Sequence, residues 1–348
     1  MPQSTHRMPL IDALKAIAAL LVLLNHFSSY GPLAAAGRSA LPELFAWCYD
    51  YGRMAVQVFL VIAGFLAVRA LSPDGQPLAH SPWPLLGKRY LRLVIPYVAA
   101  LVLAIAAAAV ADIWLNDGAI PAPPTLPQLL AHVLLLHGLL GVDALSAGVW
   151  YIAIDFQLFA LLTLLLWAGR RDRLAPALVL TVAALSLFWF NRDASWDNWA
   201  IYFFGSYGLG AAAWWASGQA RARLLLGLVA IVTVSALLVN FRLRIELALI
   251  VALLLGFARH GRWLERWPDV GLFNFLGRIS YSLFLVHFPV LLLANALYAG
   301  LALATPGAAL LVLLAALLTS VGLATLFHRW IESPAAGRRI SAALGLRV

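Results

Sequence analysis

The sequence predicts an all-α protein, a polytopic helical bundle of about ten membrane-spanning helices with both termini in the cytoplasm. Hydrophobic residues make up 63% of the 348 positions and charged residues only 11%, against about 25% charged in an ordinary soluble domain. Apolar runs of about 17 to 25 residues, the length that crosses a bilayer, recur along the chain. Lys and Arg gather in alternate connections between these runs, as they do in cytoplasmic loops.

The predicted spans follow these runs in order. They lie at 10–30, 54–71, 93–115, 148–168, 174–190, 199–217, 222–240, 243–258, 279–300 and 306–328. The shorter apolar run at 126–140 follows a Pro-rich segment, and its length favours an interfacial or re-entrant segment over a span. No polar stretch is long enough for a soluble domain of about 50 residues. Residues 1–348 are therefore predicted to form a single membrane domain.

The basic residues orient these spans. With ten spans and a cytoplasmic amino terminus, the outer side keeps only Arg38, Arg53, Arg192, Arg242 and Arg244. The net charge of +9 is thus interpreted as a topology signal and not as a nucleic-acid-binding surface. The one cysteine, Cys48, excludes an intramolecular disulfide and a cysteine cluster for a metal.

The first predicted helix carries three ionisable side chains, Asp12, Lys15 and His26. Such groups in a membrane helix usually face the protein interior or a water-filled cavity. Asp12 and Lys15 can pair near the cytoplasmic end. Lys15 and His26 return to nearly the same helical face, about 16 Å apart along the axis. His26 can act as a general base, since histidine exchanges protons near neutral pH; the alternative is a histidine that only hydrogen-bonds a neighbouring helix.

The fourth predicted span begins with Trp150 and places Asp155 and Gln157 below the outer surface. A buried carboxylate needs a partner, and His26 is a candidate because both would lie in the outer half of the bundle. Asp155 would then orient the imidazole, as a carboxylate does in a catalytic triad. The alternative is a protonated carboxyl, or one that faces a water-filled vestibule.

Two further segments carry polar side chains. The cytoplasmic segment from Arg69 to Arg92 is the densest basic patch, and Arg89 and Arg92 share a helical face that can hold phosphates. An ordinary topology signal with lipid headgroup contacts explains the same pattern. The ninth predicted span carries Ser280, Tyr281 and His287, with Pro289 permitting a kink. No phosphate-binding Gly-rich loop, metal-ligand spacing or nucleophile elbow occurs, so no metal site is predicted.

Six segments in this order resemble the membrane-bound acyltransferase-3 family: IDALKAIAALLVLLNH, VQVFLVIAGFL, KRYLRLVIP, WYIAIDFQLF, GRISYSLFLVHFP and RWIESP. In that family a Lys or Arg precedes an essential His by eleven positions, which matches Lys15 and His26. Its arginine pair associated with the acyl donor matches Arg89 and Arg92. The usual Glu of the fourth motif appears as Asp155, the usual Ser before Gly-Phe is Ala63, and a frequent Asp is Gln57.

The resemblance implies an O-acyltransferase of the bacterial inner membrane. Its donor would be a cytoplasmic acyl-CoA, acetyl-CoA in particular, its acceptor a hydroxyl of a glycan or glycolipid, and it would hold no bound cofactor. His26 would be the general base, Asp12 would position Lys15, and Asp155 would orient or stabilise protonated His26. The donor would be held by Lys15, Arg69, Arg89 and Arg92. Candidate substrate-binding residues are Trp150, Gln157, Ser280, Tyr281 and His287.

Two chemical alternatives stay open. Direct transfer is expected because the sequence offers no evident nucleophile, although an acyl-histidine intermediate is also allowed. The same polar residues are compatible with a proton-coupled exporter of a glycan or lipid intermediate, with His26, Asp155 and His287 as relay groups. Acyl transfer by the purified protein separates the enzyme from the exporter.

Overall fold

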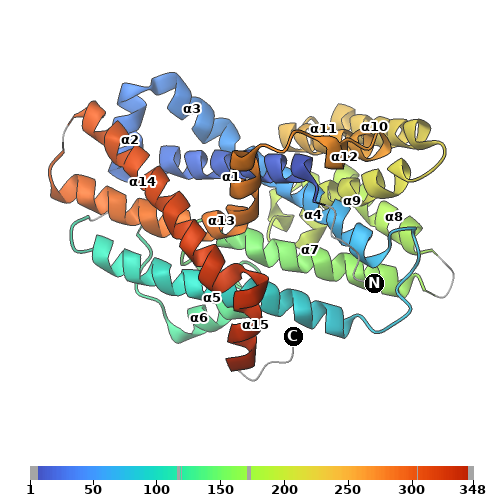
Figure 1. Cartoon of the computed structure of the whole chain (residues 1–348), viewed down its shortest axis with the longest axis horizontal. Coiled ribbons are helices and arrows are strands. Elements are labelled where there is room, and N and C mark those ends of the chain that lie inside the picture. Colours follow the sequence, from blue (N-terminus) through green and yellow to red (C-terminus); the bar gives the residue numbers. More distant parts are fainter. Residues whose placement is uncertain (1–6, 116–117, 119, 171–173, 304, 344–348) are drawn as a thin grey trace. The chain divides into compact units, whose positions relative to one another are not determined.

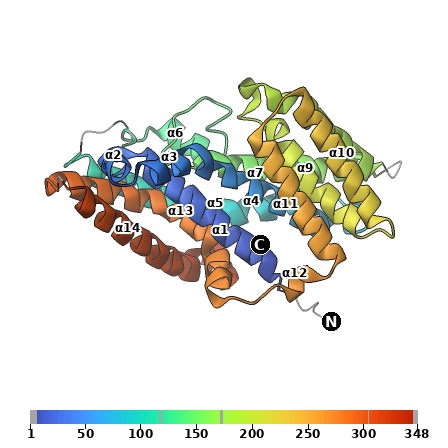
Figure 2. The same ribbon diagram turned by 90° about the horizontal axis from the view of Figure 1, so that it is seen from above.

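The computed structural model describes residues 7–115, 118, 120–170, 174–303 and 305–343 of the chain. The protein is 80% helical and has no strand among the residues described, which confirms the all-α class. Its helices, shown in Figures 1 and 2, are α1 (Pro9–Ser29), α2 (Gly31–Ala40), α3 (Pro42–Tyr51), η1 (Gly52–Ala55), α4 (Val56–Leu71), α5 (Trp83–Ala111), α6 (Leu126–Val133), α7 (Val149–Ala168), α8 (Ala175–Phe188), η2 (Phe190–Arg192), η3 (Ala194–Trp196), α9 (Ala200–Ser217), α10 (Ala222–Val239), α11 (Leu243–His260), α12 (Trp263–Arg266), α13 (Gly271–Gly300), α14 (Pro306–Phe327), η4 (His328–Glu332) and α15 (Pro334–Ala343).

Each of the ten predicted spans is a helix, although two begin earlier than predicted. Helix α5 starts at Trp83 and α13 at Gly271, because their polar first turns continue the same helices. The run at 126–140 holds only the eight-residue helix α6, too short to cross a bilayer. Within the described part of the chain, eight helical segments are long and apolar enough to span a membrane. The protein is therefore an integral membrane protein.

Helices α9 and α11 occupy two of the predicted spans but are not among those eight segments. Helix α11 carries charged residues at both ends. Helix α9 is rich in glycine, alanine and aromatic residues, and nearly all of its side chains are buried. It packs against α4, α8, α10 and α11. A helix enclosed by other helices contacts them and not lipid. Small residues that permit close packing therefore matter more in it than high hydropathy.

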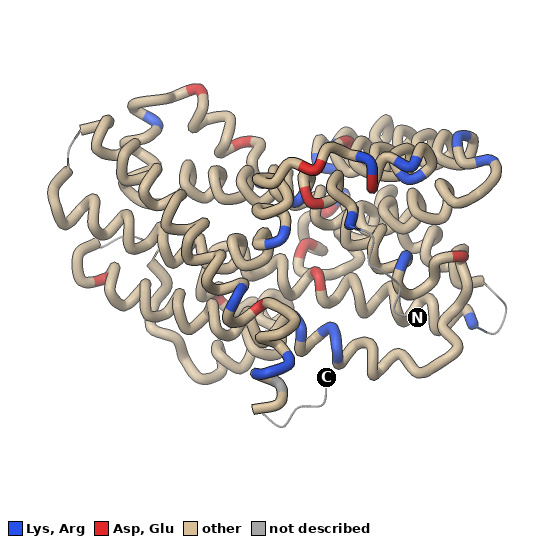
Figure 3. The backbone as a smooth tube through the Cα atoms, viewed as in Figure 1, with Lys and Arg blue, Asp and Glu red and all other residues tan. Residues whose placement is uncertain are grey.

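The helices form two compact units, each described separately. The first, unit 1, comprises the described residues of Met1–Ala18, Val56–Gly87 and Ile154–Gly277. The second, unit 2, comprises those of Ala19–Ala55, Lys88–Ala153 and Arg278–Val348. Helices α8 and α14 contain no charged residue within their bounds, and Figure 3 shows long uncharged stretches along the helices. Such surfaces suit a hydrocarbon environment.

Glycines let α4 and α9 approach closely in unit 1. A methyl group placed on Gly64 would overlap the carbonyl oxygen of Tyr207, and one placed on Gly210 would overlap that of Val61. A second link is the hydrogen bond that Ser206 donates to Gln57 Oε1 at 2.6 Å. The 56–66 segment therefore owes its Gly and Gln to the packing of α4 on α9.

Asparagines on two helices fasten the end of α1 in unit 2. Asn25 Nδ2 donates to the carbonyl oxygens of Cys48 (3.0 Å) and Tyr49 (2.9 Å) at the end of α3. Asn295, on α13, accepts from the backbone N–H of Leu33 at 2.9 Å and donates to the carbonyl of Tyr30 at 3.3 Å. These bonds satisfy backbone groups that helix ends leave open and hold α1 against α13.

Candidate functional site

Two buried histidines meet where α1 packs on α13 in unit 2. The Nδ1 atom of His26 lies 2.6 Å from the Nε2 atom of His287, and the rings stack with centroids 4.9 Å apart. His26 is 9% exposed and His287 1%. His287, which the sequence presented as a candidate substrate-binding residue, is thus the direct partner of His26.

The hydrogen bonds of His287 assign the protons of the pair. His287 Nδ1 lies 2.9 Å from the carbonyl oxygen of Leu283, and a carbonyl only accepts, so this nitrogen donates. In a neutral imidazole the other nitrogen is then an acceptor. His26 Nδ1 must therefore donate to His287 Nε2, which leaves the lone pair of His26 on Nε2. No residue in the described part of the chain hydrogen-bonds that atom. In this tautomer His26 can accept a proton at Nε2, as a general base must.

Aromatic rings and one glycine enclose the pair. Tyr30 and Phe288 present edges to the His26 ring, with centroids 5.6 and 6.4 Å away. A methyl group placed on Gly148 would lie 3.5 Å from His26 Cε1 and 3.0 Å from Phe284 Cζ. Gly148 also has φ +81°, a conformation that favours glycine. The backbone before α7 therefore runs close to the edge of the His26 imidazole.

His287, and not a carboxylate, is the hydrogen-bonding partner of the His26 Nδ1 atom. The sequence reasoning gave Asp155 the orienting position of a triad carboxylate, which binds the histidine nitrogen opposite the reacting one. That nitrogen, Nδ1 of His26, is taken by His287. Asp155 is 4% exposed and belongs to unit 1. Its stabilisation of a protonated His26 stays a prediction.

A pocket of about 440 Å³ in unit 1, the cationic pocket, brings together several predicted donor-binding residues. Its wall includes Asp12, Lys15 and Arg69, together with Arg7, which the sequence offered only as a topology signal. Arg7 Nε is 3.3 Å from the Asp12 carboxylate. Three cations and one carboxylate leave a formal charge of +2, which suits an anionic ligand.

The remaining predicted residues occupy different environments. Arg89 and Arg92 lie in the early turns of α5, ahead of the span predicted at 93–115, and belong to unit 2. Gln157 is bonded to backbone, since its Oε1 accepts from Ala200 N–H at 3.0 Å. Tyr281 donates to the carbonyl of Leu93 at 3.0 Å.

Two candidate substrate-binding residues differ in exposure. Ser280 is buried, with 6% of its surface exposed, whereas Trp150 is 39% exposed. Of this pair, only Trp150 therefore presents a substantial surface to a ligand. Acceptor binding by either residue stays a prediction.

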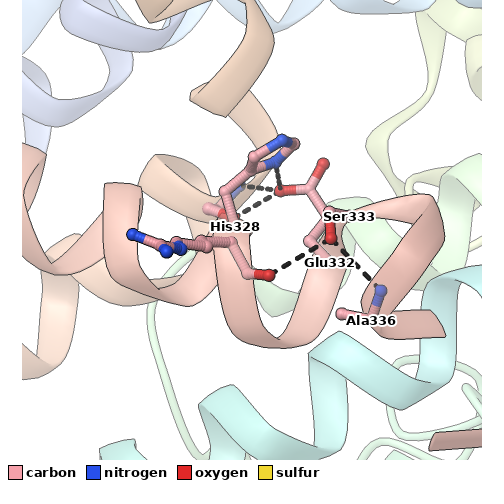
Figure 4. Close-up of polar contacts among 6 residues, drawn as sticks. His328, Glu332, Ser333 and Ala336 are labelled. Carbon is pink, nitrogen blue, oxygen red and sulfur yellow. Dashed lines mark hydrogen bonds and ion pairs between the residues drawn. The ribbon is translucent and has the colours of Figure 1, made fainter. Parts of the chain in front are cut away.

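Glu332, in the RWIESP segment, links the end of α14 to α13. Its carboxylate accepts from the backbone N–H of Ser282 at 3.1 Å and from the Ser282 hydroxyl, and lies 3.1 Å from His328 Nδ1. Figure 4 shows His328 and Glu332 on the π-helical turn η4, and Ser333, directly after this turn, accepts from Ala336 N–H at the start of α15. The contacts of Glu332 tie η4 to α13 and are a structural link.

A second stacked histidine pair, which the sequence reasoning missed, lies in the segment around α6. The rings of His132 and His137 are 4.3 Å apart and nearly parallel, at 9°. His132 is bonded through both nitrogens, to Gln128 O and Leu145 N. Both ring nitrogens of His137 are buried without a hydrogen bond among the described residues. Burial, helped by the neighbouring His132, lowers the pKa of His137 to about 4.

No described group of three His, Cys, Asp or Glu residues could hold a metal.

Comparison with known proteins identifies the family of the chain. The model of the acyltransferase-3 family, described as an acyltransferase domain, matches residues 9–328. No curated protein and no solved structure gives a match. The matched range includes His26, His287 and all the residues of the cationic pocket except Arg7 and Met8. Since it covers nearly the whole sequence, the chain belongs to the acyltransferase-3 family and is a membrane acyltransferase.

Proposed function

We propose that the protein transfers an acetyl group from cytoplasmic acetyl-CoA to a hydroxyl of a glycan or glycolipid, with His26 as the general base. The observation that carries the proposal is the pairing of His26 with His287, which directs the lone pair of His26 onto an unbonded Nε2. A positioned base of this kind typically contributes about 10² to 10⁴-fold to a rate. The acceptor class and a bacterial inner-membrane location rest on the family resemblance alone.

The proposed reaction is a direct transfer that needs no other reactant. His26 Nε2 takes the proton of the acceptor hydroxyl as its oxygen attacks the thioester carbonyl carbon. The tetrahedral intermediate collapses, the carbon–sulfur bond breaks, and the imidazolium returns the proton to the CoA thiolate. The products are an acetyl ester and free CoA. His287 Nε2 keeps accepting from His26 Nδ1–H throughout and stabilises the imidazolium.

The cationic pocket of unit 1 is the proposed binding site for donor phosphates. Arginine and lysine at its wall, Arg7, Lys15 and Arg69, match the chemistry of a CoA nucleotide, because guanidinium groups bind phosphate oxygens in pairs. Asp12 holds Arg7 through its ion pair. Arg89 and Arg92 are proposed as additional donor-binding residues from the resemblance.

Kinetics of purified variants test the two roles separately. Acetyl-CoA turnover with a membrane glycolipid extract is expected to lose kcat in His26→Ala, by about 10²-fold or more. Arg69→Ala is expected to raise the KM for acetyl-CoA about tenfold with kcat retained, since it removes binding common to ground and transition states. Arg223→Ala, an exposed arginine on α10, is the matched control and should change neither. A His26→Ala enzyme with full kcat at equal folding contradicts the proposal.

A further inference from the structure

The structure contains a small cavity in unit 2 beside the histidine pair. Its volume is about 10 Å³, and its wall includes Tyr97, Leu101, Ser146, Val149, Phe284 and Leu285. About 10 to 15 Å³ on this measure is the room that one water molecule needs. The cavity is therefore of single-group size, closed to a chain of several carbons unless its wall moves.

One wall residue and one neighbouring glycine link the cavity to the histidine pair. Phe284 belongs to the cavity wall, and its ring centroid lies 6.3 Å from that of His287. Gly148 lies between wall residues of the same loop, and a methyl group placed on it would touch both Phe284 and His26 Cε1. Phe284 therefore borders the cavity and also packs near the His287 ring.

One polar atom of the wall has no hydrogen-bond partner. The Tyr97 side chain is fully buried, and its hydroxyl makes no hydrogen bond with any residue in the described part of the chain. A buried hydroxyl without a partner costs free energy. A ligand oxygen that accepts a hydrogen bond would remove that cost.

We infer that this cavity is the acyl pocket of the enzyme, which takes the methyl group of an acetyl donor while the Tyr97 hydroxyl donates to the acyl carbonyl oxygen. This inference rests on the proposed acyl transfer and adds the residues that select the acyl chain. Leu101 and Phe284 are apolar wall residues that a longer acyl chain would have to displace. As the acceptor oxygen attacks, negative charge grows on the carbonyl oxygen, and the hydrogen bond from Tyr97 strengthens. Tyr97 keeps its proton, so it stabilises the charge without changing the balance of the reaction.

The proposed acyl pocket is tested by the preference of each variant for acetyl-CoA over butyryl-CoA. The purified protein receives acetyl-CoA or butyryl-CoA with the same glycolipid extract, and the ratio of the two rates is measured. The wild type should prefer acetyl by about 10²-fold or more, since each misfitting methylene is worth roughly 10 to 200-fold. Leu101→Ala should lower this ratio at least about tenfold. Leu292→Ala, an equally buried leucine of α13 that is not part of the wall, should leave it unchanged. Because the ratio is internal to each sample, loss of folded protein does not affect it.

Tyr97→Phe tests the hydroxyl itself. Removing one donor to a developing oxyanion typically costs about 10² to 10³-fold in kcat, and the chain-length ratio should stay as in the wild type. Two results would overturn the acyl pocket while the wild type still transfers acetyl groups: an unchanged acetyl-to-butyryl rate ratio in Leu101→Ala, or full activity in Tyr97→Phe. Either result would leave the proposed function standing. Absence of acyl transfer from either donor by the wild type overturns both.

Discussion

The position of one proton decides what His26 can do. The carbonyl of Leu283 fixes the tautomer of His287, and His287 in turn fixes that of His26. In a triad the orienting carboxylate carries a charge, whereas His287 is an uncharged acceptor. A neutral partner is less costly to bury in a membrane bundle, which explains why a second histidine suits this place in the fold.

The orienting role of His287 predicts a separation between its effects on kcat and KM. His287→Ala leaves His26 Nδ1–H without its acceptor and frees the ring, so kcat should fall about 10² to 10⁴-fold while the KM for acetyl-CoA stays unchanged. His287→Gln should recover part of the activity because its amide oxygen can accept from His26. The control, His80→Ala, changes an exposed histidine of the 72–82 connection. Equal kcat in wild type and His287→Ala, measured at matched thermal stability, would show that His287 does not orient the base.

Some site residues could be predicted from the sequence and their partners could not. His26, Lys15 and Arg69 were evident as ionisable side chains in or beside apolar helices. The partner of His26 was not, because His287 is 261 residues away and the choice between it and Asp155 depends on helix packing. Tyr97 gave no signal, since an interfacial tyrosine is common in membrane helices and only its lack of a hydrogen bond distinguishes it.

At the scale of elements, the α4 and α9 pair shows a contact that composition does not reveal. Gly64 and Gly227 are both glycines of apolar helices. The Cβ of an alanine at Gly64 would overlap the carbonyl oxygen of Tyr207, whereas one at Gly227 meets nothing within 4 Å. Only the first glycine is required by packing.

This difference predicts opposite effects of the same substitution. Gly64→Ala forces α4 away from α9 and should destabilise the protein by about 1 to 3 kcal/mol. Gly227→Ala should leave stability unchanged or raise it by up to about 1 kcal/mol, because alanine favours the helix. The thermal unfolding midpoint in detergent measures both. Equal midpoints for the two variants would show that α4 and α9 are not in backbone contact.

The segment around α6 predicts a dependence of stability on pH. His137 has an ordinary pKa of 6.5, which burial lowers to about 4 in the folded protein. At a pH between these values the unfolded chain binds a proton that the folded protein does not. The free energy of unfolding therefore falls as the pH drops from 6.5 to 4. Above or below that window His137 contributes no change. From pH 7 to pH 5 the loss amounts to about 2 kcal/mol.

His137→Phe removes this titration and keeps a ring to stack on His132. The unfolding midpoint of the variant should fall less between pH 7 and pH 5 than that of the wild type, and His80→Phe should behave as the wild type does. His132, whose pKa burial also lowers, remains in both proteins and supplies the residual dependence. Identical shifts in His137→Phe and wild type would show that His137 is solvated in the folded protein.

At the scale of the whole molecule, hydropathy located the ten predicted helices and missed those that are not long apolar runs. Helices α2 and α3 lie where no span was expected, and their ten-residue lengths are too short for a hydropathy window to detect. The polar starts of α5 and α13 were likewise assigned to loops. In each case helix formation depends on packing partners more than on local composition.

Arg242 and Arg244, two of the arginines predicted on the outer side, have a structural role. Arg242 is 8% exposed and donates to the carbonyl oxygens of Leu187 (2.9 Å) and Ala236 (3.1 Å) near the ends of α8 and α10. Arg244 donates to the carbonyl of Asn191 at 2.7 Å. Cations near helix carboxyl ends satisfy open carbonyls and favour the helix dipole. These two arginines therefore serve the fold and do not weigh against an outer location.

The most direct test of acetyl transfer through His26 is the stoichiometry of the reaction in proteoliposomes. Labelled acetyl-CoA is added with a glycolipid acceptor, and released CoA thiol and labelled ester are counted for wild type, His26→Ala and His80→Ala. We expect one thiol for each ester in the wild type and in His80→Ala, and a loss of both products in His26→Ala. Movement of the glycolipid across the membrane by the wild type, with neither thiol nor ester formed, would contradict acyl transfer and identify the chain as an exporter.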